Sequence, residues 1–349
     1  MKVIDLFSGV GGFSLGCESA GAKVISSLEK DTRIFSGHKS NFPESEHINE
    51  DIRDISVKDT FSKYKSLSKE MIIIGGPPCQ GFSMKGKRLG LNDDRNFLFN
   101  RFVDVVKFLE PKWFVMENVP SLLTAENGYF LREIIDIFRV LDYNIDWGVL
   151  DASDYGVPQK RRRSFIIGSK SFPVKLTIKT EPKITVWDAI SDLPEIESGL
   201  GSYEMEYTSP PLKKYQKMMR NKSEILTNHI ATNHSSSAIS RMKLVPVNGD
   251  RSSIPSHLHT KSIFSGTWAR LKPDEQSRTI TTRFDTPSSG MFTHPYQHRC
   301  ITVREAARLQ SFPDNFVFNG TKTIQMKQVG NAVPPLLAKK LVSSLMGVE

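Results

Sequence analysis

Short apolar runs alternate with amphipathic stretches through the first half of the chain. The apolar runs predict strands at residues 2–7, 23–28, 71–74, 113–116, 145–150 and 164–168. A helix is expected to begin near residue 11, and another to cover residues 129–141, where apolar side chains recur at helical spacing. Strands alternating with helices predict an α/β fold with a doubly wound, mainly parallel sheet. Ligands of such sheets bind at the carboxyl ends of the strands.

The pattern changes near residue 172. From there to about residue 300 the periodicity is weak, and Ser, Thr, Pro, Asn and charged residues dominate. We therefore expect a smaller, loop-rich domain at 173–321, and a larger domain made of 1–172 plus 322–349. Within the last fifty residues, a helix is expected at residues 302–310. Thr302 can cap its start, and Glu305 stands three residues later, as in a capping box. A final helix is expected at 334–346, with Pro in its first turn.

The composition is that of an ordinary globular protein, with 38% hydrophobic and 24% charged residues among 349. No stretch approaches the roughly 20 apolar residues of a membrane span, and no signal peptide is recognisable at the N-terminus. Three widely separated cysteines indicate reduced thiols. We expect a cytoplasmic protein without a membrane partner. No histidine or cysteine spacing predicts a metal site, and His257 and His259 are interpreted as loop residues.

The positive charge is concentrated in one part of the chain. Residues 211–283 hold 13 Lys and Arg against four Asp and Glu, so the net charge of this stretch is +9, which equals that of the whole chain. Such a block suits a polyanionic partner. Charge alone would equally suit a basic surface that binds nothing.

A glycine-rich loop follows the first predicted strand. The segment Asp5-Leu-Phe-Ser-Gly-Val-Gly-Gly12 can bring backbone N–H groups close to a ligand. Glu29 ends the second strand, where a carboxylate can accept hydrogen bonds from two ribose hydroxyls. The third glycine of a dinucleotide fingerprint would fall at Ser14, so the spacing disfavours a nicotinamide cofactor. Alone, the loop is also explained by a tight strand-to-helix turn.

Three further segments carry candidate chemistry. Gly75-Gly-Pro-Pro-Cys79 follows the strand at 71–74, and its prolines stiffen the chain before the thiol. Met116-Glu117-Asn118 ends the next strand, so Glu117 is expected close to Cys79. Pro158-Gln-Lys-Arg-Arg-Arg163 alone would be interpreted as a solvated basic run.

A thiol, a carboxyl group and arginines together suit methylation of a pyrimidine. Carbon 5 of cytosine is a poor nucleophile until a thiolate adds to carbon 6, after which it can attack a sulfonium methyl group. A carboxyl group at N3 and an arginine at O2 would stabilise the charge that builds up. Nearby arginines also favour ionisation of the thiol.

At this point the chain resembles the bacterial DNA (cytosine-5)-methyltransferases of restriction-modification systems. Six of the family's motifs occur in its order: D-L-F-S-G-x-G-G, P-P-C-Q-G-F-S, E-N-V, Q-K-R-R-R, T-V-R-E-A-A-R-L-Q and Q-V-G-N-A-V-P-P. The resemblance covers about residues 2–170 and 270–346 and leaves out the interval between. It implies a methyltransferase fold, S-adenosylmethionine as methyl donor, no metal and a monomer. It also implies duplex DNA as partner, with a possible cognate endonuclease that shares the site without being bound.

The resemblance also implies roles for individual residues. Cys79 attacks carbon 6, Glu117 is the acid at N3, and Arg161 and Arg163 hold the flipped cytosine and the thiol site. Glu29 binds the ribose, and Asp51 and Ile52 contact the adenine edge. The pocket is completed by Phe7, Gly9, Gly11, Pro78, Leu98, Asn331 and Val333. Residues 80–95, with Gly81, Gly86 and Gly90, resemble the lid that closes over DNA.

One position departs from the family's pattern. Some members carry an aromatic or apolar residue after the ribose glutamate, packed on the adenine, whereas this chain has Lys30, of which only the aliphatic stem could pack. DNA sequence is expected to be read by residues of about 180–270, with Arg241, Lys243 and Arg251 as candidates.

Three other functions remain open at this point. The first is methylation of tRNA by the RNA-acting branch of the same family, against which stand Gly81 and the long basic segment. The second is a DNA-binding regulator with an inactive methylase core, which the complete set of catalytic residues disfavours. The third is a nicotinamide oxidoreductase, disfavoured by the glycine spacing.

Overall fold

The computed structural model describes residues 1–78, 97–262 and 265–348. The chain forms two compact units. The first unit comprises Met1–Asp151, Arg162–Lys179 and Pro335–Glu349, and the second comprises Ala152–Arg161 and Thr180–Pro334. These borders differ from the division expected from the sequence, at 172/173 and 321/322. Residues 152–161 group with the second unit, because the side chains of Gln159 and Arg161 bind the backbone of Ile280 there.

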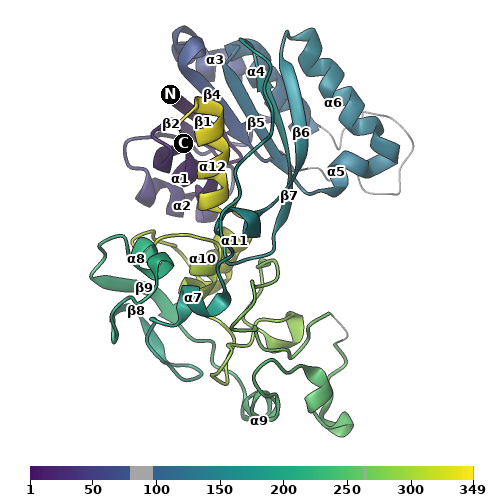
Figure 1. The fold of residues 1–349 in the computed structure, drawn as a ribbon. Helices are drawn as coiled ribbons and strands as arrows, with labels where there is room; N and C mark the ends of the chain where they lie inside the picture. Colours follow the sequence, from purple (N-terminus) through teal and green to yellow (C-terminus); the bar gives the residue numbers. More distant parts are fainter. Residues whose placement is uncertain (79–96, 263–264, 349) are drawn as a thin grey trace. The chain divides into compact units, whose positions relative to one another are not determined.

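A seven-stranded sheet forms the centre of the first unit (Figure 1). Its order is β3-β2-β1-β4-β5-β7-β6, and β7 is antiparallel to both of its neighbours, whereas the other pairs are parallel. The doubly wound, mainly parallel sheet predicted from the sequence is confirmed. The strands are β1 (Lys2–Leu6), β2 (Lys23–Leu28), β3 (Glu46–Ile48), β4 (Met71–Gly75), β5 (Trp113–Asn118), β6 (Asn144–Asp151) and β7 (Arg162–Ser169).

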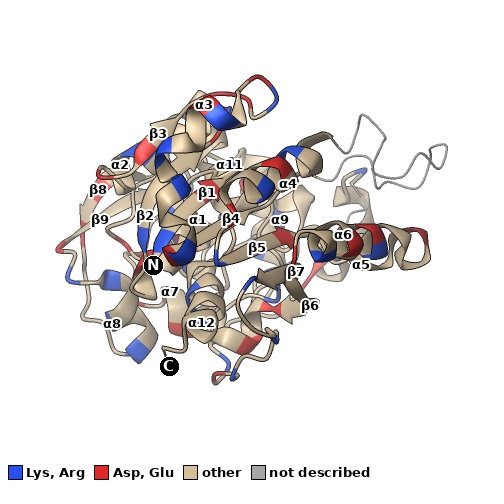
Figure 2. Cartoon of the chain, turned by 90° about the horizontal axis from the view of Figure 1, so that it is seen from above, with Lys and Arg blue, Asp and Glu red and all other residues tan. Residues whose placement is uncertain are grey.

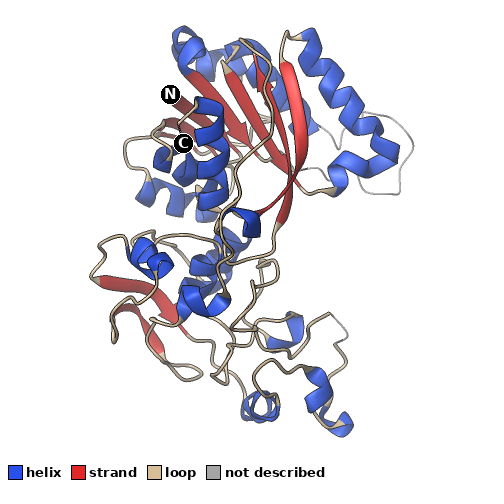
Figure 3. Cartoon of the chain, viewed as in Figure 1, coloured by secondary structure: helices blue, strands red, loops and turns tan. Residues whose placement is uncertain are grey.

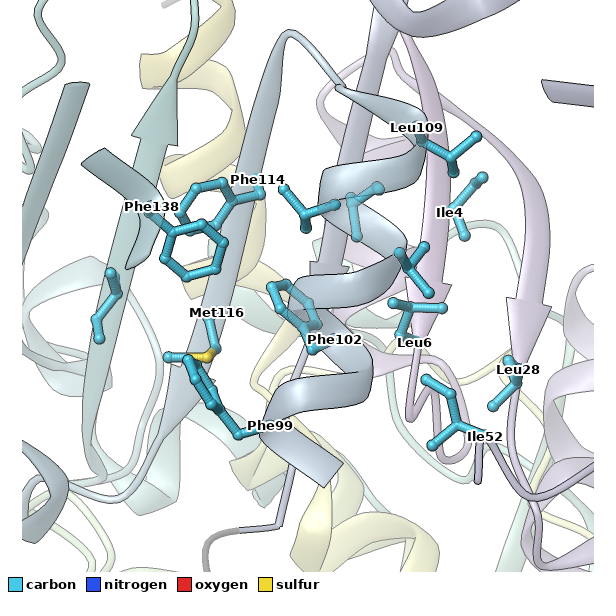
Figure 4. Packing of buried hydrophobic residues seen from close by; sticks show 14 of the residues in the cluster. Ile4, Leu6, Leu28, Ile52, Phe99, Phe102, Leu109, Phe114, Met116 and Phe138 are labelled. Carbon is cyan, nitrogen blue, oxygen red and sulfur yellow. The ribbon is translucent and has the colours of Figure 1, made fainter. Parts of the chain in front are cut away.

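Two helices supply most of the apolar cover on one face of this sheet (Figure 4). Side chains of α4 (Phe97–Leu109) and α6 (Tyr129–Val140) pack on alternate residues of β1, β4, β5 and β7. The rings of Phe114 and Phe138 stack with centroids 4.0 Å apart. Shorter elements on this unit are α2 (Thr32–Asn41), α3 (Val57–Phe61), the 3₁₀ segment η1 (Ser62–Glu70) and α5 (Ser121–Thr124).

The opposite face is covered by α1 (Gly12–Ser19) and α12 (Pro335–Met346). Phe13 of α1 meets Phe165 of β7 edge-on, and Phe165 points away from the face to which Ile166 contributes. Gly16 lets α1 and α12 approach closely, since a Cβ there would clash with Ala338 and lie 2.7 Å from the carbonyl oxygen of Pro335. The predicted C-terminal helix therefore exists and returns to the first unit.

The second unit is rich in loops, as its pattern predicts (Figure 3). Its sheet has two antiparallel strands, β8 (Gly201–Glu206) and β9 (Ile225–Ile230). The predicted capping box is present, with the Thr302 side chain and Glu305 bonding reciprocally at the start of α10. The helices are α7 (Val186–Ile190), α8 (Lys214–Arg220), α9 (Ser236–Leu244), α10 (Val303–Leu309) and α11 (Lys322–Asn331).

Neither a membrane-spanning helix nor a cluster of metal-ligating side chains occurs in the parts of the chain that the structure describes. No helix there combines the length and the apolar character needed to cross a bilayer. Nor do three or more His, Cys, Asp or Glu side chains gather there in a way that could hold a metal ion.

Candidate active site

The glycine-rich loop joins β1 to α1 in a conformation that needs its glycines. Gly9 and Gly11 have φ of 56° and 97°, and Phe7 also has a positive φ of 61°. A Cβ on Gly11 would clash with the ring of Phe42, whereas a Cβ on Gly9 would meet nothing within 4 Å. The loop is therefore tightly packed on one side and open at Gly9, which leaves room for a ligand beside its backbone.

Glu29 follows β2 directly and faces this loop. One of its carboxylate oxygens accepts a hydrogen bond from the backbone N–H of Gly9 at 3.2 Å, and the other from that of Asp31 at 2.9 Å. Burial raises the pKa of Glu29 despite these two hydrogen bonds. The half-buried carboxylate is thus fixed at the carboxyl edge of the sheet, where hydroxyls of a ribose would suit it.

Three buried polar side chains, Asp5, Ser14 and His38, lie behind the loop and are not among the predicted site residues. The Ser14 hydroxyl donates to the Asp5 carboxylate at 2.6 Å and lies 3.2 Å from Nε2 of His38. Burial raises the pKa of Asp5 to about 7 and lowers that of His38 to about 3. The polar residues at 5 and 14 flank the glycines in the sequence, which is the one local signal of this support.

The predicted adenine-edge residues lie beyond β3. The carboxylate of Asp51 makes two hydrogen bonds with the Arg53 guanidinium, at 2.6 and 3.0 Å, and lies 3.7 Å from the Lys30 ammonium. The hydrogen bonds from Arg53 lower the pKa of Asp51 to about 2. Ile52 is buried in the core, and its carbonyl accepts from Nε of Arg101 at 2.9 Å.

The other predicted pocket residues are spread over both units. Pro78 is exposed just after β4, and Leu98 is half-buried in the first turn of α4, against the apolar core. Asn331 ends α11 and Val333 follows it, so both belong to the second unit. Their part in a cofactor site stays a prediction.

The carboxylate of Glu117, which the sequence predicts to be catalytic, pairs with one of the predicted arginines. Oε1 of Glu117 lies 2.9 Å from Nε of Arg163, and both side chains are largely buried. Because β7 runs antiparallel to β5, its first residues lie beside the last residues of β5, with Glu117 opposite Phe165. Arg163, two residues earlier, is then a diagonal neighbour of Glu117 on the same face.

The segment that leads to the predicted nucleophile lies at the same place. The Asn118 amide donates to the carbonyl oxygen of Pro77 at 2.9 Å, and a Cβ on Gly76 would come within 3.0 Å of the Glu117 carboxylate. Gly76–Pro78 is thus held beside Glu117. Cys79 itself lies outside the described residues, as does the predicted lid at 80–95 with Gly81, Gly86 and Gly90. The holding role of Asn118 was not foreseen, although the E-N-V motif contains it.

Arg161 is placed differently from Arg163. It is buried in the second unit, where its guanidinium donates to the carbonyl oxygens of Ile280 at 3.1 Å and Gly330 at 2.8 Å. The buried side chain of Gln159 accepts from the backbone N–H of Ile280 at 2.7 Å. Both side chains therefore fix the backbone around residue 280.

Two of the three candidate DNA-reading residues are bound to their own unit. Arg241 donates to the carbonyl oxygen of Leu258 at 2.7 Å, and Arg251 to those of Ser262 and Thr260 at 2.6 and 2.9 Å. Lys243 is exposed. Further basic side chains gather on α8, which carries Lys214, Lys217 and Arg220 (Figure 2).

Comparisons with known proteins agree with this arrangement. The family described as "C-5 cytosine-specific DNA methylase" matches residues 1–347, including the interval that the motifs left out. The type II methyltransferase M1.HphI of Haemophilus parahaemolyticus is 39% identical, over 99% of this chain and 87% of its own. M.DdeI of Desulfomicrobium norvegicum is 38% identical, over 99% and 88%.

A solved structure is similar over its whole length. It is a candidate DNA modification methyltransferase encoded within an Escherichia coli prophage, with 31% identity, a TM-score of 0.82, and coverage of 100% of this chain and 99% of that one. The fold, the family and the methyl donor inferred from the sequence are confirmed. The chain belongs to the C-5 cytosine-specific DNA methylases, which transfer the methyl group of S-adenosylmethionine to carbon 5 of cytosine in DNA.

Proposed function

We propose that the chain is the modification enzyme of a type II restriction system and methylates one short sequence in duplex DNA. The support is the similarity, over nearly the full length, to proteins named type II methyltransferases. A cognate endonuclease would recognise the same DNA sequence without binding this protein. The enzyme would act as a monomer in the bacterial cytoplasm, where its DNA substrate is found.

The pair formed by Glu117 and Arg163 beside Gly76–Pro78 carries the proposed mechanism. The target base leaves the stack, because carbon 5 cannot react inside a duplex. The thiolate of Cys79 adds to carbon 6 while Glu117 protonates N3 and Arg163 contacts O2. Methyl transfer would release S-adenosylhomocysteine; water would then take the carbon 5 proton as the thiolate leaves carbon 6, and the N3 proton would return to Glu117, which restores the aromatic ring.

The described residues fit the methyl donor. Glu29 would accept hydrogen bonds from the ribose, and the open side of Gly9 would admit the ligand close to the backbone. S-adenosylmethionine supplies an electrophilic methyl group at this place. The roles of Phe7, Gly11, Asp51, Ile52, Pro78, Leu98, Asn331 and Val333 in the same site belong to the proposal.

Arg161 takes a more indirect part in this proposal. Its bonds to the carbonyl oxygens of Ile280 and Gly330 favour a positioning role in the second unit over contact with the base. DNA sequence would be read by exposed residues of about 180–270, among which Lys243 is a better candidate than Arg241 or Arg251.

The mechanism is tested with a Cys79→Ala variant and a matched Cys300→Ala control, since Cys300 is buried in the second unit. Transfer of labelled methyl to duplex DNA should vanish in the first and persist in the second. Wild-type enzyme should also form a denaturation-resistant adduct with a duplex containing 5-fluorocytosine, because fluorine at carbon 5 prevents release of the thiolate. Efficient transfer by Cys79→Ala would contradict the covalent mechanism.

The substrate is tested in parallel on duplex DNA and on tRNA. Bisulfite sequencing of plasmid incubated with the enzyme and S-adenosylmethionine should reveal protected cytosines in one recurring short context. Methylation of tRNA with no protected plasmid cytosine would contradict the proposal and support the RNA-acting alternative.

A further inference from the structure

The guanidinium group of Arg270 joins two parts of the second unit. The side chain is buried, and each of its five N–H groups has an acceptor. Two of these groups donate to the carbonyl oxygens of Val245 and Met242, at 2.7 and 2.8 Å, where α9 ends. The other three bind the loop at residues 294–298, through the carbonyl oxygens of His294 and Gln297 and Nδ1 of His298, at 2.8, 2.7 and 2.8 Å. A single side chain thus ties the end of α9 to this loop.

Helix α9 is also attached at its other end. Just before the helix, Nε2 of His234 accepts a hydrogen bond from the backbone N–H of Cys300 at 3.1 Å. The backbone N–H of His234 donates to the hydroxyl of Ser198 at 2.8 Å. The end of the helix belongs to a small apolar cluster of buried side chains, Met242, Val245, Ile254 and Trp268. Because this cluster is small, the polar attachments at both ends are needed to fix α9 on the unit.

The last turn of α9, which lies at the margin of the second unit (Figure 1), carries an exposed positive charge. This charge belongs to Lys243, and the carbonyl groups that Arg270 binds, at residues 242 and 245, lie on either side of it. Residues 235–269 hold four Lys and Arg and a single acidic residue, Asp250. In the proposed function this part of the chain reads the DNA sequence, and a helix fits the major groove. The position of Lys243 on DNA would then depend on Arg270.

We propose that Arg270 is a positioning residue for DNA recognition, which holds the last turn of α9, and with it Lys243, in place before DNA binds. The inference rests on the proposed reading of DNA by this segment and adds the side chain that orders it. An element that is already ordered in the free protein loses less conformational freedom on binding. Without the anchor, the last turn would be ordered in only a fraction of the molecules, and the apparent affinity for DNA would fall with that fraction.

The experiment measures methyl transfer to a short duplex that contains the sequence found by bisulfite sequencing. Arg270→Lys keeps the charge, but one ammonium group cannot reach the acceptors on both sides. The KM for the duplex should rise about fivefold, whereas kcat and the KM for S-adenosylmethionine should stay within about twofold of the wild type. Arg304→Lys is the matched control, because Arg304 is also buried in the second unit and binds backbone carbonyl groups elsewhere. It should leave all three constants within about twofold.

A double-variant cycle tests whether Arg270 acts through Lys243. Lys243→Met alone should raise the KM for the duplex about tenfold, because a cation that contacts DNA is lost. In Arg270→Lys/Lys243→Met the KM should remain about tenfold above the wild type, since no charge is left to position. If Arg270 contributed only to stability, the two effects would multiply to about fiftyfold, and that result would overturn the inference.

Hydrogen exchange keeps the inference testable if Arg270→Lys folds poorly. In the free wild-type enzyme the backbone amides in the last turn of α9 should be protected, and DNA should add little to this protection. Rapid exchange of this turn in the free wild type would overturn the inference, as would an unchanged KM for the duplex in a folded Arg270→Lys variant. If the wild type methylated no duplex DNA, or did so without sequence preference, the proposed function itself would fail, so the two failures are distinguishable.

Discussion

The interiors of the two units use different chemistry. In the first unit the largest fully buried side chains are phenylalanines, seven of them, on helices and strands that pack face to face. In the second unit four arginines, Arg161, Arg299, Arg304 and Arg308, are fully buried as well, beside phenylalanines such as Phe284, Phe312 and Phe318. A sheet with two helical faces can bury apolar area continuously, whereas a loop-rich unit leaves many backbone carbonyl groups without a partner in secondary structure.

Arginine side chains can donate to these carbonyl groups, since the guanidinium offers five donors in a fixed plane. Arg304 donates to the carbonyl oxygens of Thr227, Pro313 and Phe316. Arg308 joins Asp192 and Asp314, which are far from each other in the sequence. The second unit is therefore held by directional polar contacts, and removal of one partner should cost more there than loss of a similar volume in an apolar core.

The largest expected effect follows from breaking a buried pair. Arg299 binds Glu305 through two contacts of 2.8 Å, with both side chains at 1% exposure or less. Arg299→Met should destabilise the second unit by about 3–5 kcal/mol, because a buried carboxylate is left without its cation. Hydrogen exchange should then rise in α10 and stay unchanged in α4. The double variant Arg299→Met/Glu305→Gln should recover part of the loss; equal exchange in α4 and α10 would show that the units do not differ in this way.

The pH dependence should differ in sign between the units. Burial alone would raise the pKa of Glu305, but Arg299 lowers it overall, so its contribution to stability is present above the ordinary carboxyl pKa and is lost as the pH falls. Burial raises the pKa of Asp5 in the first unit from 3.8 to about 7. Its folded form holds the proton more tightly, so this contribution is present at low pH and is lost as the pH rises towards 7.

Asp5→Asn isolates the second of these effects. Between pH 5 and 8 the variant should gain roughly 2–3 kcal/mol of stability relative to the wild type, measured by urea unfolding at each pH. His38 lies in the same buried group, but it is present in both proteins and cancels in the difference. Parallel stability curves for the two proteins would mean that Asp5 titrates normally.

A smaller effect tests the close packing of the first unit. Gly16→Ala places a Cβ against Ala338 and Pro335, where α1 meets α12 through backbone and short side chains that cannot move aside. We expect a loss of about 1–3 kcal/mol in unfolding free energy from overpacking. Gly148→Ala is the control, since its Cβ would meet only the end of the Leu176 side chain, at 3.1 Å. Equal stability of the two variants would indicate that α12 is loosely docked.

The difference between the apolar interior of the first unit and the polar interior of the second also decides how much of the fold the sequence could predict. Strands β1, β2, β4, β5, β6 and β7 were predicted within two residues, because each gathers several apolar residues in a short stretch. Strand β3 has only three half-buried residues and leaves no such signal. Helix α4 lies outside the predicted elements although Phe99, Phe102, Val106 and Leu109 recur on one face.

The second unit and part of the site could not be predicted from local sequence patterns, because they depend on contacts between residues far apart in the chain. Arg304 and Arg308 are four residues apart on α10, and charged residues so spaced ordinarily indicate an exposed face. Their burial depends on distant acceptors such as Asp192. In the same way, Glu29 and Glu117 could be placed at strand ends from the sequence, whereas the pairing of Glu117 with Arg163 required the reversed direction of β7.

The smallest expected change comes from an ion pair that, like that of Arg299, has two contacts with one carboxylate but lies in a different environment. Arg33 binds Asp31 through two contacts of 3.0 Å on the surface of the first unit, where its side chain is 69% exposed. Arg33→Met should alter the unfolding free energy by less than about 1 kcal/mol, because water replaces the lost partner. Urea unfolding of this variant beside Arg299→Met compares an exposed and a buried ion pair, each with two contacts. A similar loss in both would mean that the two-contact geometry itself, rather than burial among carbonyl groups, makes the arginines of the second unit indispensable.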